Sequence, residues 1–177
     1  MAVVNDAAFT QPSIEIHYFS LPTLTALAEG DLAEAEELSG LTLGEYFVSP
    51  TMRQVWKRRT VQVTADPSVQ EWVTGAVIAD GIPVGRAGYH GPPEDGLLEA
   101  GYEIDPAHRR RGYARSALST LIDRARREPD VSILRLCIRP DNAASLAVIR
   151  PFDFHRNGEQ IDPDDGLEHI YELDVSR

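Results

Sequence analysis

The sequence predicts a single α/β domain in which a helical N-terminal part precedes a mixed sheet. The clearest strand signal is Leu98–Ile104, where apolar residues alternate with Glu and Gly. Directly after Gly112, apolar residues recur at helical spacing and charged residues occupy the other face. Further upstream, Asp80-Gly81 separates two β-rich runs and is a typical hairpin turn. Strand, helix and hairpin signals in one chain indicate an α/β fold.

The N-terminal part indicates one short strand followed by three helices. Asp31 with Glu34 three residues later forms a capping-box pattern, which is typical of a helix start. Proline at the beginning of the first and third helical patterns agrees with its preference for the first helical turn. The expected elements are a strand at 13–20 and helices from Pro22, from Asp31 to Leu38 and from Ser49 to Asp66.

The rest of the chain alternates strands with two helices. Asp105-Pro106 ends the central strand, because proline cannot donate to a ladder and restricts the residue before it. Turn-forming residues fill the loop GPPEDG at 91–96 and are frequent again at 158–166, where a second loop is expected. The expected strands are 69–79, 82–90, 98–104, 131–138 and 167–175, and the expected helices are 112–127 and 142–149.

Composition limits the class of protein. The net charge of −11 argues against general binding of nucleic acid or anionic membranes and favours a cationic partner, although acidic surfaces also simply confer solubility. We see no signal peptide and no apolar run of membrane-spanning length, and the single cysteine, Cys137, fits a reducing compartment. We therefore expect a cytoplasmic protein with one domain, residues 1–177, in which about residues 1–12 are a candidate disordered segment.

The junction between the central strand and the long helix carries the strongest functional signal. Arg109, Arg110 and Arg111 precede Gly112, and Arg115 follows one turn later, although the whole chain is acidic. A helix N-terminus presents free N–H groups and the positive end of the helix dipole, which attract phosphate. Glycine lets the backbone approach a ligand closely. The pattern predicts a local anion site; the alternative is a solvated arginine turn.

The order R-x-x-G-x-A, formed by Arg109, Gly112 and Ala114, resembles the acyl-CoA pyrophosphate loop of the GNAT superfamily of N-acetyltransferases. The longer phrase GYEIDPAHRRRGYA is similar to the RimJ/RimL-like branch, which includes ribosomal-protein alanine acetyltransferases. The resemblance implies a central, mixed, mostly antiparallel sheet that is splayed at its middle and flanked by helices. It also implies acetyl-CoA as co-substrate, with the pantetheine arm paired to the freed strand edge at Tyr102–Ile104.

A second region, after the buried strand, resembles the part of these enzymes that lines the CoA side. Its N-x-x-S spacing is formed by Asn142 and Ser145, and the alternative is that both simply cap a helix. Two residues depart from the family pattern: Asp153 replaces a glycine, and Ile149 replaces a tyrosine that serves as general acid in many relatives. The candidate cofactor-binding residues are Tyr102, Ile104, Arg109, Arg110, Arg111, Gly112, Tyr113, Ala114, Arg115, Asn142 and Ser145.

Amine acetylation requires a group that removes a proton from the ammonium, and a carboxylate with a pKa raised by burial suits that task. Glu99 and Glu103 share one face of the central strand. The resemblance places a general base early in this strand, so Glu99 is the first candidate and Glu103 the second; the alternative is that either points to solvent. We interpret Cys137 as a packed thiol, and His90 as an acceptor-site residue or a loop histidine without a role.

The sequence thus predicts an acetyl-CoA-dependent N-acetyltransferase that moves acetyl directly to a primary amine, either a protein N-terminus or a small molecule. A non-catalytic acyl-CoA sensor on the same fold is one alternative, motivated by Ile149 and Asp153. An interaction protein that uses the arginine loop is the other. The histidines show no metal-ligand spacing, so no metal is expected. A homodimer is a candidate assembly, because dimers are the commonest oligomers.

Overall fold

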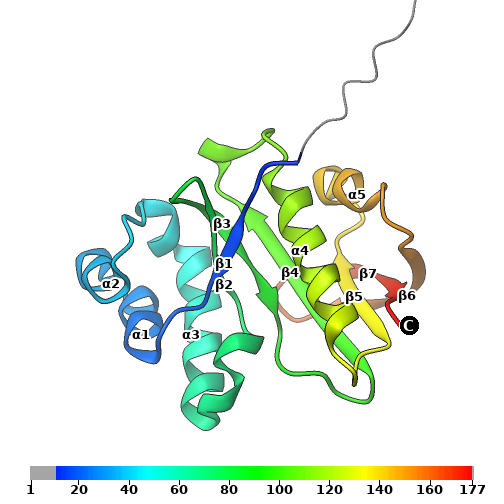
Figure 1. Ribbon diagram of the computed structural model, residues 1–177, viewed down its shortest axis with the longest axis horizontal. Coiled ribbons are helices and arrows are strands. Elements are labelled where there is room, and N and C mark those ends of the chain that lie inside the picture. Colours follow the sequence, from blue (N-terminus) through cyan, green and yellow to red (C-terminus); the bar gives the residue numbers. More distant parts are fainter. Residues whose placement is uncertain (1–10, 177) are drawn as a thin grey trace, which may run out of the picture.

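The computed structural model describes residues 11–176, which form a seven-stranded sheet with helices on both faces (Figure 1). The expectation for residues 1–10 lies outside this range. The strands are β1 (Glu15–His17), β2 (Gly75–Ala79), β3 (Ile82–Tyr89), β4 (Leu97–Ile104), β5 (Ile133–Ile138), β6 (His155–Asp162) and β7 (Gly166–Asp174). The helices are α1 (Leu21–Glu29), α2 (Leu32–Ser39), α3 (Pro50–Ala65), α4 (Tyr113–Arg127) and α5 (Ala143–Ile149).

The sheet order is β1-β2-β3-β4-β5-β7-β6, and every neighbouring pair is antiparallel except β4 with β5. The predicted mixed, mostly antiparallel sheet is therefore confirmed. The β2–β3 hairpin turns at Asp80 and Gly81, whose φ angles of 50° and 76° are both positive, as a two-residue type I′ turn requires. The predicted capping of α2 is also present, because the Asp31 side chain accepts from the Glu34 N–H at 3.0 Å.

Two sequence expectations were wrong. Residues 69–72 are not the start of a strand but part of a 3-10 helix, Pro67–Trp72, whose first turn is held by the Asp66 carboxylate accepting from the Ser68 N–H. The loop expected at 158–166 is largely occupied by β6 and the first residue of β7. β6 is a polar and mostly exposed edge strand, so it lacks the apolar alternation by which strands are recognised, and its ladder with β7 defines it instead.

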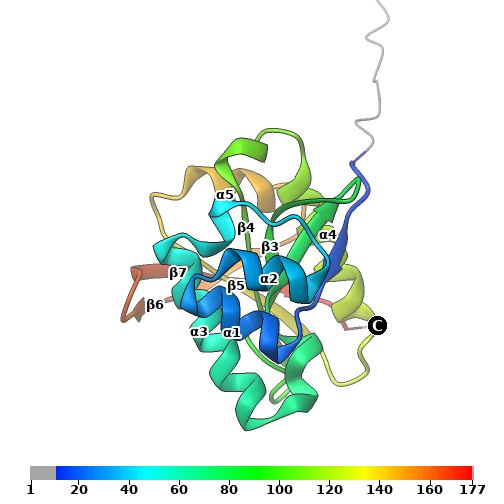
Figure 2. The same ribbon diagram turned by 90° about the vertical axis from the view of Figure 1, so that its left-hand side faces the viewer.

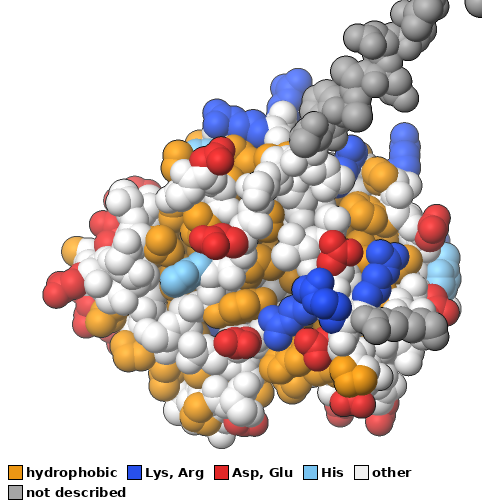
Figure 3. All heavy atoms as spheres, viewed as in Figure 1, with side chains coloured by type: hydrophobic (Ala, Val, Ile, Leu, Met, Phe, Trp, Pro, Cys, Tyr) orange, Lys and Arg blue, Asp and Glu red, His pale blue; other side chains and the backbone are white. Residues whose placement is uncertain are grey.

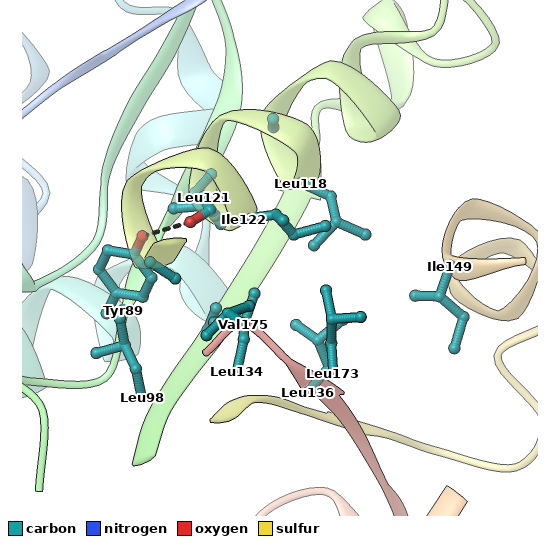
Figure 4. Close-up of a cluster of buried hydrophobic side chains, with 14 of the residues drawn as sticks. Tyr89, Leu98, Leu118, Leu121, Ile122, Leu134, Leu136, Ile149, Leu173 and Val175 are labelled. Atoms are coloured by element: carbon teal, nitrogen blue, oxygen red, sulfur yellow. Dashed lines mark hydrogen bonds between the residues drawn. The ribbon is translucent and has the colours of Figure 1, made fainter. Parts of the chain in front are cut away.

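The two faces of the sheet carry separate hydrophobic cores. In β2, Val77 and Ala79 belong to the core under α4, whereas Ala76 and Ile78 belong to the core with α1 and α3. Figure 2 looks onto the side where α1, α2 and α3 cover the strands. Figure 4 shows the α4 core, in which the Tyr89 hydroxyl donates to the carbonyl oxygen of a buried residue of α4 at 2.7 Å. None of the helices in residues 11–176 is both long and apolar enough to cross a membrane.

The parallel strands β4 and β5 pair only at their beginnings. Leu97–Glu99 lies opposite Ile133–Arg135, and no ladder continues beyond these three pairs. Further along, β4 stays with β3 and β5 stays with β7, so the two strands diverge. The splay that the resemblance implied is therefore present, and the facing edges of β4 and β5 are free of strand partners beyond that point.

A buried carboxylate ties the C-terminal strands together. Glu172 of β7 is 6% exposed; Arg135 of β5 donates to its Oε1 from Nη2 at 2.6 Å and from Nε at 3.0 Å, and Asn157 of β6 donates to its Oε2. Burial alone would raise the pKa of Glu172, but these hydrogen bonds outweigh it and leave the pKa below its usual range. Glu172 is thus held as a charged group between its two neighbouring strands.

We expect Arg135→Ala to lower the free energy of unfolding by about 1–3 kcal/mol at neutral pH, because it leaves a buried carboxylate without its cation. A depressed folded-state pKa contributes stability above the usual glutamate range and loses it as pH falls through the folded pKa. The difference between wild type and variant should therefore shrink in acid. Urea unfolding near pH 7 and near pH 3.5 measures it. Arg156→Ala, which breaks an exposed pair with Glu159, should cost under about 0.5 kcal/mol; an equal cost would contradict the interpretation.

Candidate active site

The splay between β4 and β5 opens a cavity of about 1580 Å³ that passes from one face of the sheet to the other. On the α4 and α5 side its wall includes Tyr113, Ala114 and Ser145. On the α3 side its wall includes Arg59 and His90. Both free strand edges line it between these ends, because Ala100–Ile104 and Leu136–Ile138 face the opening. A ligand can therefore enter from one face and meet a second ligand from the other.

The loop between β4 and α4 closes the α4 end of the cavity. Gly112 precedes the helix with φ at 87°, in the left-handed region that glycine adopts without strain, and no side chain caps the helix. The N–H groups of the first helical turn therefore remain available to an anion. Arg109, Arg110 and Arg115 line the cavity here, whereas Arg111 does not. In Figure 3 basic side chains gather along the upper edge of the molecule, the region of this loop in Figure 1.

Arg109 is anchored to the strand it follows. Its Nε donates to the Ile104 carbonyl at 2.9 Å, and its Nη2 lies 3.9 Å from Oε1 of Glu103. The Ile104 carbonyl therefore already accepts a hydrogen bond. The part of the β4 edge that stays free for a ligand is the backbone between Glu99 and Ile104. Arg86 of β3 donates from Nη2 to the other Glu103 oxygen at 3.1 Å. Because arginines engage both oxygens of Glu103, this carboxylate does not face the cavity as a free base.

Glu99 lies where β4 leaves β5, on the face of the sheet that α3 covers. Its Oε1 is 3.0 Å from Nδ1 of His90, and the Cys137 thiol of β5 lies beside it. The His90 contact lowers the pKa of Glu99 more than burial raises it, so the pKa falls below its usual range. Glu99 therefore does not meet the condition set for a carboxylate base, a pKa that burial raises above its usual range. Burial raises the pKa of the Cys137 thiol to about 12, assisted by the neighbouring carboxylates.

Polar residues of α3 hold His90 in place. The Gln62 side chain donates to the His90 carbonyl at 2.6 Å and accepts from Nη1 of Arg59 at 2.7 Å. Arg59 is 7% exposed, and its Nε donates to the Thr74 hydroxyl at 3.1 Å. Burial lowers the pKa of Arg59 to about 10. Sequence reasoning missed Arg59, although a signal exists: it falls at helical spacing within the apolar stripe of α3, where a solvated arginine is not expected.

The α5 side presents capping residues and one unpaired hydroxyl. Asn142 caps α5, since its Oδ1 accepts from the Ser145 N–H at 3.0 Å, so the capping alternative describes its contact here. The Tyr102 hydroxyl is buried and has no hydrogen-bond partner of normal geometry among residues 11–176. Burial raises the pKa of Tyr102 to about 12, and the nearby Ser145 side chain lowers this pKa by a smaller amount. Ile149 is buried in the α4 core (Figure 4), so its side chain does not reach the cavity.

Acidic residues of the β6–β7 hairpin form the rim of the cavity on the α3 side: Asp162, Asp164, Asp165 and Glu168 all line it. Arg58 of α3 reaches across to this rim, with Nη1 3.3 Å from a carboxylate oxygen of Asp164. Burial and the neighbouring acids raise the pKa of Glu168, although Gln160 donates to it. The described residues hold no group of three or more His, Cys, Asp or Glu side chains that could bind a metal.

Comparison with known proteins assigns the chain to a family. Residues 23–155 match the family model described as an acetyltransferase (GNAT) domain. The chain belongs to the GNAT acetyltransferase family. The resemblance predicted from Arg109, Gly112 and Ala114 is confirmed. The predicted enzyme class, an N-acetyltransferase, and the co-substrate, acetyl-CoA, are confirmed at the level of the family.

Three similar proteins illustrate the family. Over 83 residues the chain is 40% identical to the L-2,4-diaminobutyric acid acetyltransferase of Streptomyces coelicolor, an alignment that covers 45% of this chain and spans about half of that enzyme, 49%. Over 153 residues it is 26% identical to the uncharacterized N-acetyltransferase YjdG of Bacillus subtilis, covering 82% of this chain and 90% of YjdG. A solved structure of RimL, a ribosomal L7/L12 alpha-N-protein acetyltransferase in complex with coenzyme A, has the same fold, with a TM-score of 0.64, 16% identity and coverage of 92% and 94%.

We expect Gly112→Ala to weaken acetyl-CoA binding about tenfold, because a Cβ here is strained at positive φ and would lie 3.1 Å from Pro12, which displaces the loop. Titration calorimetry measures the affinity. Gly40→Ala is the matched control: it has φ at +69° and an equally strained Cβ, but it ends α2 with open space around it. Equal affinities in wild type and Gly112→Ala would show that this loop does not bind the co-substrate.

Proposed function

We propose that this protein transfers the acetyl group of acetyl-CoA directly to a primary amine, on a small molecule or a protein N-terminus. The observation that carries the proposal is the cavity through the sheet, which is basic at its α4 end and acidic at its α3 end. These opposite charges fit an anionic acyl donor on one face and a cationic amine on the other. The two ligands would meet where β4 and β5 part.

The α4 end suits the pyrophosphate of acetyl-CoA. The free N–H groups of the first turn of α4 and the guanidinium groups of Arg110 and Arg115 would bind it, as helix N-termini and arginines bind phosphate elsewhere. The pantetheine arm would follow the free edge of β4, and the unpaired hydroxyl of Tyr102 offers a partner on the way. A backbone N–H of the same edge would stabilise the oxyanion of the tetrahedral intermediate.

The α3 end suits an amine with an additional positive charge. The acidic rim places Glu168 and Asp162 at the mouth of the cavity, near Glu99. A carboxylate rim attracts an ammonium group and can hold a second one while the first reacts. The relative from Streptomyces acts on a diamino acid, which agrees with this charge pattern. A small di- or polyamine is therefore the acceptor class that the rim favours over an uncharged one.

A non-catalytic acyl-CoA sensor is the second candidate, and Ile149 is the observation that favours it. Its side chain is buried against α4, so no side chain from this position can protonate a leaving thiolate. The sensor predicts acetyl-CoA binding without release of CoA in the presence of any amine. An interaction protein, the third candidate, predicts no acetyl-CoA binding at all.

The first test is calorimetric titration of acetyl-CoA, followed by a thiol-release assay with a panel of amines. We expect Arg115→Ala to weaken binding about 10- to 100-fold, through the loss of a charge-assisted contact with phosphate. Arg111→Ala removes an equal charge outside the cavity wall and should change affinity less than threefold. Folded wild-type protein that does not bind acetyl-CoA would overturn the proposal, and binding without turnover would favour the sensor.

A second prediction concerns the acceptor. Glu168→Gln should raise the KM of a diamine about fivefold, corresponding to roughly 1 kcal/mol for a partly solvated charge contact, and should leave the KM of the matched monoamine unchanged. Steady-state kinetics with both amines measures the difference. Glu159→Gln, a charge change on exposed β6 outside the cavity, is the control. An unchanged KM for the diamine would exclude a role of the rim in recognising its second charge.

A further inference from the structure

We infer that His90 accepts the proton from the acceptor amine, and that Glu99 is a positioning residue that holds the imidazole in the productive tautomer. This inference rests on the proposed acetyl transfer and names the group that activates its nucleophile. It also changes the role predicted for Glu99 from the sequence, from base to the partner of a base.

The first support is the position of the ring. Nδ1 of His90 lies 3.0 Å from Glu99, and Nε2 lies 3.2 Å from the place where a Cβ on Gly101 would be. The imidazole therefore fills the space that a side chain at residue 101 would need, on the same face of β4 as Glu99 and Glu103. This places Nε2 beside the free edge of β4, within the cavity and close to where β4 leaves β5.

The second support is the anchoring of His90, which a loop residue without a role would not need. Its N–H donates to the Glu99 carbonyl at 2.9 Å, and its carbonyl accepts from Gln62. Gln62 is in turn held by Arg59, a buried cation whose other hydrogen bond goes to Thr74. Burying a guanidinium is unfavourable unless its contacts compensate. Here the buried Arg59 holds Gln62, and Gln62 holds the backbone of the half-exposed His90. Preorganisation of that kind is typical of catalytic groups.

The third support is that neither carboxylate of β4 is free to act. Glu99 faces Nδ1 of His90 and the Cys137 thiol. Glu103 accepts a hydrogen bond from Arg86 on one oxygen, and Arg109 forms a longer ion pair of 3.9 Å with the other. A carboxylate that faces Nδ1 favours the tautomer with the proton on Nδ1. The lone pair is then on Nε2, and no hydrogen bond joins Nε2 to any residue between 11 and 176. The charged groups that act on His90 are Glu99 from β4 and Asp162 from the hairpin.

The reaction balances with these groups alone. Nε2 takes one proton from the ammonium, and the resulting imidazolium is stabilised by the Glu99 carboxylate. The amine lone pair then forms the C–N bond to the thioester carbon, and the C–S bond breaks with its electron pair on sulfur. The remaining excess proton on nitrogen passes to the CoA thiolate, and the imidazolium returns its proton to water. The products are the amide and CoA, and no oxidant, metal or covalent enzyme intermediate is needed.

A spectroscopic test needs no substrate. In protein labelled with 15N-histidine, the ring nitrogen shifts of His90 should show the neutral ring protonated at Nδ1. In Glu99→Gln the population should move toward the Nε2-protonated form that free histidine prefers. Wild-type His90 with its proton on Nε2 would overturn the inference, whatever the protein turns over. This readout would not move if Glu99 served only to stabilise the fold.

A kinetic test uses thiol release with the best amine of the panel. His90→Gln should lower kcat at least about 100-fold, whereas Glu99→Gln should lower it about tenfold, and both should bind acetyl-CoA as wild type does. Added imidazole should partly restore His90→Ala but not Glu99→Gln. The control is His155→Gln, on exposed β6 outside the cavity. A greater loss in Glu99→Gln than in His90→Gln would make Glu99 the base, and wild type that binds acetyl-CoA but acetylates no amine would overturn the proposed function itself.

Discussion

The separation of β4 from β5 after three residue pairs is the constraint on which the rest of the structure depends. Strands in a sheet normally satisfy their backbone groups with each other, so a splayed pair leaves polar edges that only solvent or a ligand can satisfy. In this protein the splay also removes the wall between the two faces of the sheet. The α4 side, with its basic loop, and the α3 side, with its acidic rim, become two ends of one cavity.

Helix α4 makes this opening tolerable. Its apolar face packs on strands from both halves of the sheet, including Leu98 of β4 and Leu134 of β5, so the two halves keep their relative position without a continuous ladder. The same helix presents its N-terminus to the cavity behind Gly112. One element thus holds the halves together and supplies the anion site, and this double use explains why a strand, a glycine loop and an amphipathic helix are so tightly linked in the sequence.

Local patterns predicted most elements because each has its own signal: period-two alternation for β4, helical spacing for α4 and Asp80-Gly81 for the hairpin. The polar edge strand β6 has no such signal, because pairing with β7 and not burial defines it. The separation of β4 from β5 was predicted only from the family resemblance, because no local pattern indicates it. The network through Arg59 and Gln62 to His90 joins residues of different elements, so no local pattern reveals it. The lowered pKa of Glu99 also depends on a contact between elements, the hydrogen bond with His90, and no local pattern indicates it.

The predominance of arginine has a chemical consequence for a protein that holds a thioester. A lysine amine beside acetyl-CoA can itself be acetylated, whereas a guanidinium stays protonated and is a poor nucleophile. The chain contains a single lysine, Lys57, which is exposed and outside the cavity wall, and the cations that line the cavity are arginines. The thiol of Cys137 is kept protonated by burial and by the acids around it. The protein is therefore built to carry a reactive acyl donor with little self-acetylation, which reserves the acetyl group for the incoming amine.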